Sequence, residues 1–332
     1  MAADRLKALF DRIRSGPIAT KWHWLGYNFT PGTEGSLYFA PLTLLALDAV
    51  DQAMPGYAEK MIKRLERMGG REKDINDYEA IVQWLAELVV VHHFVQHNWP
   101  SRPTFIMEPT VGTSKKNPEI LIEIPGIGGL GVEVKAPKLL EHQNRRATYP
   151  WQLVARSNSL DQADFDGDVT LPRDNPVKDF LISANAKFSG FRATYPNFQS
   201  VLFIVWDDFV NEPLSALLNP SSGLFTPNSF NRDQNGAVTY PNIDAVILMR
   251  HQHQLRRGMA NRPPIDERRH FLDYGQRDQF PPHVLVPNPA GQSLNAVWLE
   301  ALGAWPLEAL PPAAEYLPGE VIIWTGTDSG EA

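Results

Sequence analysis

The chain has no cysteine among its 332 residues. This absence excludes disulfide bonds, zinc sites with thiolate ligands and catalysis by a thiol. Chains without disulfides are typical of reducing compartments, so we expect a cytoplasmic protein.

Long apolar runs are also missing. The N-terminal sequence MAADRLK lacks the hydrophobic segment of a signal peptide. Apolar stretches such as Val201–Trp206 are far shorter than the about 20 residues that a membrane-spanning helix needs. We therefore expect no membrane partner.

Basic charge is not in excess, because the formal net charge at pH 7 is −7. A nucleic acid would therefore have to bind at a local basic patch rather than through the charge of the whole chain. The composition is otherwise ordinary, and 43% hydrophobic with 21% charged residues allows a sizeable core. The length suits one large α/β domain with additions, or two smaller domains.

The middle of the chain alternates helical and strand patterns. Apolar residues recur at steps of three and four up to about His97, which predicts a helix that Asn76 or Asp77 caps. A second helix is expected from Pro176 to about Thr194. The predicted strands are Thr104–Met107, Glu119–Ile124, Gly131–Ala136 and Val201–Trp206. This order of elements predicts an α/β fold with a mixed central sheet flanked by helices.

The rest of the chain surrounds this core. Residues 1–75 are expected to form a helical N-terminal extension, residues 76–210 the core, and residues 211–332 a C-terminal extension that continues the same globule. Residues 137–175 and 219–240 are polar and are expected to be irregular. The elements expected in the two extensions are helices at Asp48–Met54, Glu59–Met68 and Ser293–Leu302, and strands at Ile243–Met249 and Glu320–Trp324.

The connection at residues 125–131 is rich in glycine. Its sequence from Gly126 to Gly131 matches the pattern GxGxxG. A dinucleotide site requires this pattern to open a helix, whereas here a strand follows. We therefore expect a β-hairpin between the strands on either side.

Acidic and basic side chains gather on one face of this hairpin. Side chains alternate between the faces of a strand, so Glu133 and Lys135 point the same way while Val132 and Val134 point into the core. Pairing of the two strands would bring Glu119 to the same end of the sheet. Adjacent carboxylates repel each other, and a divalent cation such as Mg²⁺ or Mn²⁺ removes that cost. With a lysine that orients water or stabilises charge on a phosphate, these groups suit phosphodiester hydrolysis.

The run Pro118-Glu119, followed by Glu133-Val134-Lys135, resembles the motif of the PD-(D/E)xK nuclease superfamily, which has the restriction-endonuclease-like fold. The core of that superfamily is helix–three strands–helix–strand, and the resemblance covers roughly residues 77–207. The first acid of the motif is normally Asp, whereas this chain has Glu119. The resemblance implies a Mg²⁺- or Mn²⁺-dependent nuclease, with DNA as the expected substrate.

The resemblance also implies further site residues. The superfamily often adds a glutamate from its first helix, and Glu87 is the expected one, with Glu79 as the alternative. A lysine or glutamine from the second helix often lies near the site, which indicates Lys187. The implied catalytic residues are Glu119, Glu133, Lys135, Glu87 and Lys187, and the implied metal ligands are Glu119, Glu133 and Glu87.

Two groups of basic residues are the expected contacts to a nucleic-acid backbone. One group follows the lysine of the motif, and the other lies in the arginine-rich segment 250–270. The expected contacts are Lys138, Arg145, Arg146, Arg256 and Arg257. An ordinary solvated loop is an equally good interpretation of the arginine-rich segment.

Two histidine pairs are weaker candidates for metal or phosphate binding. His93 and His97 are four residues apart on a helix, but no glutamate completes an HExxH motif, so we expect structural roles. His251 and His253 are expected at the surface.

Three functions stay open. The leading one is a DNA nuclease, for which the large extensions favour a role in bacterial anti-phage defence. The second is a catalytically inactive nuclease-fold protein that binds nucleic acid or another protein. The third is an assembly protein, in which the nine tryptophans and 16 phenylalanines would serve packing and interfaces. The simplest alternative for Glu133 and Lys135 is an exposed ion pair.

Overall fold

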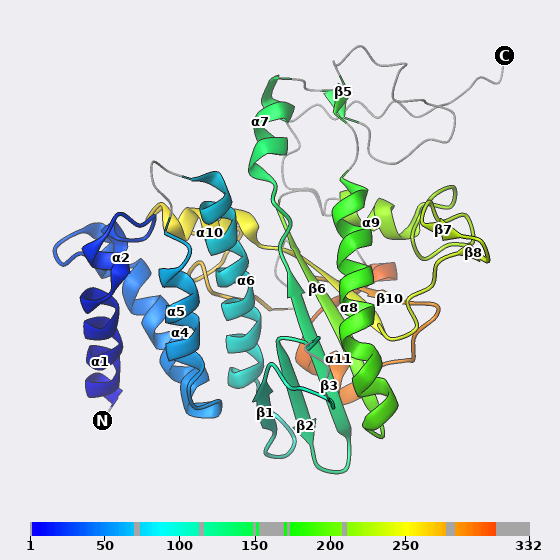
Figure 1. Cartoon of the computed structure of the whole chain (residues 1–332), viewed down its shortest axis with the longest axis horizontal. Helices are drawn as coiled ribbons and strands as arrows, with labels where there is room; N and C mark the ends of the chain where they lie inside the picture. The colour runs from blue at the N-terminus through cyan, green and yellow to red at the C-terminus, as the bar shows by residue number, and fades with distance from the viewer. Residues whose placement is uncertain are drawn as a thin grey trace.

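A seven-stranded mixed sheet forms the centre of the molecule (Figure 1). The computed structural model describes residues 2–69, 74–112, 116–148, 151–152, 169–170, 173–207, 211–276 and 283–309. The sheet has the order β1-β2-β3-β6-β9-β10-β11. Its strands are β1 (Thr104–Met107), β2 (Ile120–Ile124), β3 (Gly128–Lys135), β6 (Phe198–Trp206), β9 (Ala245–Arg250), β10 (Val284–Pro287) and β11 (Trp305–Pro306).

Strand directions make the sheet mixed, as the sequence predicts. β1, β2 and β3 pair antiparallel, whereas β3, β6 and β9 pair parallel. β10 is antiparallel to β9, and β11 is parallel to β10. The C-terminal extension therefore adds strands to the same sheet. The strand expected at Glu320–Trp324 lies outside the described residues.

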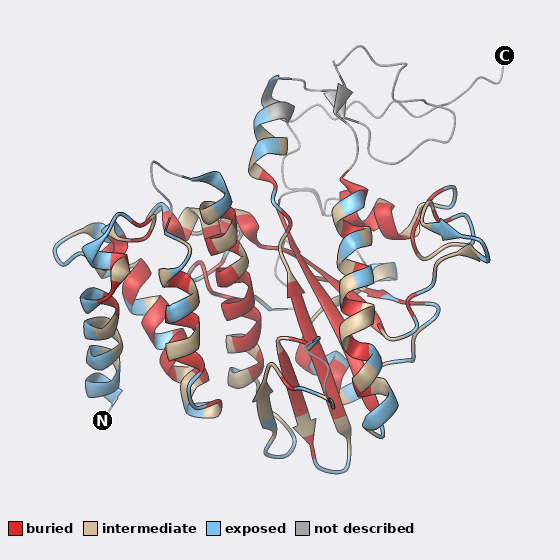
Figure 2. Ribbon diagram, viewed as in Figure 1, coloured by how far each residue is buried: buried red, intermediate tan, exposed pale blue. Residues whose placement is uncertain are grey.

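One long helix covers each face of the sheet. α6 (Ile75–Gln96) packs its Trp84 and Leu88 in the same core as Val132 of β3, and α8 (Asp174–Thr194) packs Phe188 in a second core with Leu202 of β6. Both faces of β3 and β6 are therefore buried (Figure 2). The alternative of an exposed ion pair at Glu133 and Lys135 is wrong for this reason, since α8 covers that face of the sheet and Glu133 is fully buried.

The starts of both helices differ from the expectation by a few residues. Asp74 caps α6, because its carboxylate accepts hydrogen bonds from the backbone amides of Asn76 and Asp77. α8 begins at Asp174, so Pro176 lies inside its first turn rather than at its first position. A proline is tolerated there because the first amides of a helix have no partner within the helix.

The glycine-rich connection is mostly strand. β3 begins at Gly128 rather than at Gly131, and the register pairs Ile124 with Gly128. A Cβ atom added to Gly131 would lie 2.6 Å from the ring of Phe198. Glycine is therefore needed here for close packing against β6, while the turn itself uses Gly126 with a φ of +80°.

The N-terminal extension is helical, as expected, and stacks beside α6 on the side away from the sheet (Figure 1). Its helices are α1 (Ala2–Ser15), α2 (Pro17–Thr20), α3 (Glu34–Leu37), α4 (Phe39–Ala53) and α5 (Tyr57–Glu66). The remaining helices are α7 (Leu140–Thr148), α9 (Asn211–Leu218), α10 (Gln252–Met259) and α11 (Ala296–Leu302). In the described ranges, no helix is long and apolar enough to cross a membrane.

Candidate functional site

The pairing of β2 with β3 brings two carboxylates together. Ile120 pairs with Val132, and the amide of Glu119 donates to the carbonyl of Val132 at 3.0 Å. Continuing this register by one residue sets Glu119 opposite Glu133, so the two side chains share one face of the sheet. The hairpin therefore brings together the two acids that the sequence singles out.

Glu133 is fully buried and holds two lysines. Its Oε1 accepts from Nζ of Lys135 at 2.7 Å and from Nζ of Lys187 at 2.6 Å. Its Oε2 is buried as well, and no hydrogen-bond partner is found for it within the described part of the chain. A buried carboxylate oxygen without a hydrogen-bond partner costs free energy, and a cation bound to it would remove that cost.

The pKa values of Glu119 and Lys135 are both raised above their ordinary values. Burial, together with the charges of Glu87 and Glu133, raises the pKa of Glu119 to about 8. Burial alone would lower the pKa of Lys135, but the charge of Glu133 outweighs it and the pKa is raised. Lys135 is therefore an ammonium near neutral pH, so it can donate to a phosphate or a water but cannot accept a proton.

Glu87 projects from α6 and is held from two sides. Its carboxylate forms a two-point ion pair with the guanidinium of Arg64 on α5, with distances of 2.5 Å and 2.9 Å. Nε2 of Gln83, one turn earlier on α6, donates to the same carboxylate at 3.0 Å. Glu87 therefore lies at the site but is already neutralised by a residue of the N-terminal extension.

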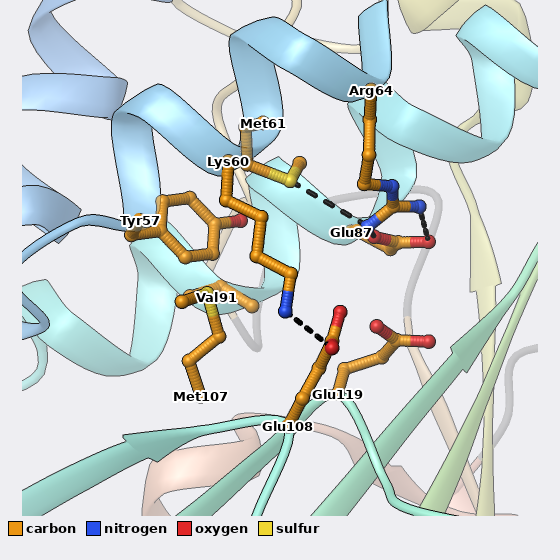
Figure 3. A pocket seen from close by; sticks show the side chains of 9 residues that line it. All are labelled: Tyr57, Lys60, Met61, Arg64, Glu87, Val91, Met107, Glu108 and Glu119. Atoms are coloured by element: carbon orange, nitrogen blue, oxygen red, sulfur yellow. Dashed lines mark hydrogen bonds and ion pairs between the residues drawn. The ribbon is translucent and has the colours of Figure 1, made fainter. Parts of the chain in front are cut away.

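A small cavity of about 10 Å³ lies between α5, α6 and the start of β2 (Figure 3). Figure 3 shows the carboxylates of Glu87 and Glu119 facing this space, with Lys60 and Arg64 reaching it from α5. This volume is enough for roughly one water molecule. The full lining is Tyr57, Lys60, Met61, Arg64, Glu87, Val91, Met107, Glu108 and Glu119.

Gln83 is a site residue that the sequence analysis misses. Besides holding Glu87, its amide donates to the carbonyl of Val134 at 3.0 Å and accepts from the amide of Ala136. One side chain thus fixes the backbone on both sides of Lys135 and the carboxylate of Glu87. The available signal is its position four residues before Glu87, where helical side chains share a face.

Glu79, the alternative to Glu87, has a structural role at the start of α7. Its Oε1 accepts from the amides of Leu139 and Leu140, at 3.1 Å and 2.7 Å, where α7 begins. A carboxylate at this position satisfies amides that the helix leaves without partners. Glu79 therefore anchors α7 to α6, and Glu87 is the glutamate of this helix that lies beside Glu119.

The basic residues expected to contact nucleic acid are largely engaged within the protein. Lys138 donates to the side chain of Asn76 at 2.8 Å, and Nε of Arg257 donates to the carbonyl of Pro263 at 2.7 Å. Arg256 donates to Gln143 and Gln252. Arg145 and Arg146 lie in α7, but their side chains are outside the described part of the structure.

The arginine-rich segment 250–270 is not a continuous basic surface. Arg250 and Arg268 are 1% and 5% exposed, so they present no charge to a ligand outside. His251 is fully buried and bonds to the carbonyl of Phe271 at 2.8 Å, which makes its expected place at the surface wrong. His253 pairs with Asp266 at 2.9 Å.

His93 has the structural role that the sequence predicts. Its Nε2 bonds to the carbonyl of Ala301 at 2.7 Å, and its ring stacks on Tyr274 with centroids 3.6 Å apart. The ring of His97 packs edge-on against Trp99.

The residues present suit a cation that brings other ligands with it. Across the described ranges, no three His, Asp or Glu side chains are arranged so that they could hold a metal ion as they stand. Mg²⁺ and Mn²⁺ nevertheless need only one or two carboxylates, since water and phosphate oxygens complete their shell. Glu119 and Glu133 would provide that pair.

Comparisons with known proteins add no relative. No protein family, curated protein or solved structure matches the chain.

Proposed function

We propose that this chain is a metal-dependent nuclease of the PD-(D/E)xK type, acting on phosphodiester bonds in DNA. The observation that carries the proposal is the facing pair Glu119 and Glu133, with Lys135 two residues beyond. In addition, no described residue bonds to the buried second oxygen of Glu133. The order α6–β1–β2–β3–α8–β6 supports a restriction-endonuclease-like core, because these elements occur in the sequence order that this fold requires.

Each residue has a distinct role in this proposal. Glu119 and Glu133 would hold Mg²⁺ or Mn²⁺, with Glu87 as a third ligand once Arg64 releases it. A divalent cation there supplies positive charge that stabilises the negative charge developing on the phosphate. The ammonium of Lys135 donates to the phosphate or to the attacking water, and Lys187 keeps the carboxylate of Glu133 in place.

The experiment is a cleavage panel with purified protein. Supercoiled plasmid, linear duplex, single-stranded DNA and RNA are each incubated with Mg²⁺, Mn²⁺ or EDTA. We expect cleavage of at least one DNA substrate that EDTA abolishes. Absence of cleavage on every substrate with either metal would contradict the proposal.

A catalytically inactive nucleic-acid-binding or assembly protein is the second candidate. It is favoured by one observation, namely that Glu87 and Glu133 pair with cations of the chain itself, Arg64, Lys135 and Lys187. Binding of DNA that is unchanged by EDTA and by Glu133→Gln, without cleavage, would support this candidate over the nuclease.

A further inference from the structure

Two cations from the N-terminal extension enter the site that we propose to be catalytic. Lys60 and Arg64 lie one turn apart on α5, and both reach the cavity beside Glu119 (Figure 3). Lys60 pairs with Glu108, and Arg64 pairs with Glu87 through two hydrogen bonds. α5 therefore contacts both an acid of α6 and an acid at the end of β1.

Glu108 has an unusual backbone conformation. Its φ is +41°, in the left-handed region that residues other than glycine rarely adopt. Its amide donates to the carbonyl of Glu119 at 2.8 Å, which fixes Glu108 beside the first acid of the motif. The acid that pairs with Lys60 is thus tied to the same strand end as Glu119.

The acids of the site already pair with cations of the chain. Lys60 pairs with Glu108, Arg64 pairs with Glu87, and Glu133 accepts from both Lys135 and Lys187. A divalent cation would add two positive charges to this cluster in a site of low dielectric. Binding of the cation is therefore favoured when a positive group leaves the acids or when an anion enters.

Arg64 is suited to both changes. A guanidinium presents paired N–H donors that fit a carboxylate or a phosphate in the same two-point geometry. The side chain of Arg64 is 28% exposed, whereas that of Glu87 is 5% exposed, so the guanidinium lies on the solvent side of the pair. Arg64 also lines the cavity that Glu87 and Glu119 face.

We propose that Arg64 is an exchangeable ligand that couples metal binding to substrate binding. Without substrate, its guanidinium neutralises Glu87 and opposes entry of the cation. With substrate, it contacts a phosphodiester of the nucleic acid and frees Glu87 for the cation. The inference rests on the proposed nuclease function, and it makes the N-terminal extension part of the substrate-binding site.

The test measures Mn²⁺ binding by electron paramagnetic resonance, which reports free Mn²⁺ and needs no turnover. The protein is titrated alone and with a short duplex whose phosphorothioate linkages resist cleavage. For the wild type we expect at least tenfold tighter Mn²⁺ binding when the duplex is present. For Arg64→Met we expect about tenfold tighter Mn²⁺ binding without the duplex and little further gain with it.

Controls separate this inference from the proposed function. Arg67→Met alters an exposed arginine next to the end of the same helix and should behave as the wild type. Mn²⁺ binding that Glu133→Gln abolishes but Arg64→Met leaves unchanged would overturn the role of Arg64 and leave the metal site standing. Mn²⁺ binding that Glu133→Gln does not alter, or no Mn²⁺ binding under any condition, would overturn both.

Discussion

Lys135 and Lys187 donate to the same oxygen of Glu133, at 2.7 Å and 2.6 Å, from two different elements. Lys135 lies two residues along β3, whereas Lys187 comes from α8 on the face of the sheet that would otherwise be open. The two ammonium groups compensate the burial of Glu133 through one oxygen and leave the other oxygen available. α8 therefore contributes to the charge state of the site as well as to the core.

Replacing Lys187 should reveal how much this second ammonium stabilises the fold. We expect Lys187→Met to lower the free energy of unfolding by about 1–3 kcal/mol, because Glu133 keeps only Lys135 as a buried partner. Urea denaturation in EDTA measures the change. Lys178→Met, on the same helix but beside Asp179 at its surface, is the matched control and should change stability by less. Equal effects of the two substitutions would contradict the role assigned to Lys187.

The acids of the site should destabilise the metal-free protein. The pKa of Glu119 is raised to about 8 by burial and by the charges of Glu87 and Glu133. Its folded pKa therefore exceeds its unfolded value, so its contribution to stability is lost as pH rises from about 4.5 towards 8. We expect Glu119→Gln to raise the melting temperature in EDTA at pH 8 by a few degrees.

The same substitution should behave differently at low pH. Near pH 4.5 the wild-type carboxyl is largely protonated in the folded protein, so Glu119→Gln should gain little there. Glu123→Gln, four residues after Glu119 on β2 and half-buried, is the control. A melting temperature of Glu119→Gln that is no higher than that of the wild type at pH 8 would show that the acid cluster is not strained.

Gln83 should position two site residues at once. Gln83→Met removes the hydrogen bonds to Glu87, to the carbonyl of Val134 and to the amide of Ala136. We expect cleavage to fall at least tenfold while substrate affinity changes little, because Lys135 shifts relative to the phosphate. We would measure kcat and KM separately on the DNA substrate that the wild type cleaves fastest. Gln96→Met, at the exposed end of α6, is the control. A rise in KM with kcat unchanged would contradict a positioning role.

Buried histidines should make the protein sensitive to acid. Burial lowers the pKa of His92 and of His93 to about 4, whereas a histidine in the unfolded chain titrates near 6.5. The unfolded state then binds more protons between these values, so stability present above pH 6.5 is lost as pH falls towards 4. We expect a loss of about 1–2 kcal/mol per histidine between pH 7 and pH 5.

Urea denaturation of His93→Gln at both pH values isolates one of these contributions. The variant should lose less stability than the wild type on going from pH 7 to pH 5. An identical loss in the two proteins would show that His93 does not couple protonation to folding.

The period-two alternation of β3 was enough to predict that Glu133 and Lys135 share a face, and the hairpin was enough to add Glu119. Arg64 could not be predicted in the same way, because its place at Glu87 depends on how α5 packs on α6, and no local pattern encodes that. The glycine run predicts the hairpin correctly, but not that β3 begins at Gly128. Glycine is typical of turns, whereas Gly131 makes room for Phe198 of β6, a contact distant in the sequence.

Nicking of supercoiled plasmid in Mn²⁺ tests the central claim most directly. Wild type, Glu133→Gln and Glu123→Gln are compared at equal concentration, after circular dichroism shows equal folding. The account predicts that the wild type and Glu123→Gln nick the plasmid at similar rates, and that Glu133→Gln is at least a hundredfold slower. Nicking by Glu133→Gln at the wild-type rate would contradict the account, since the activity would then belong to another site or another protein.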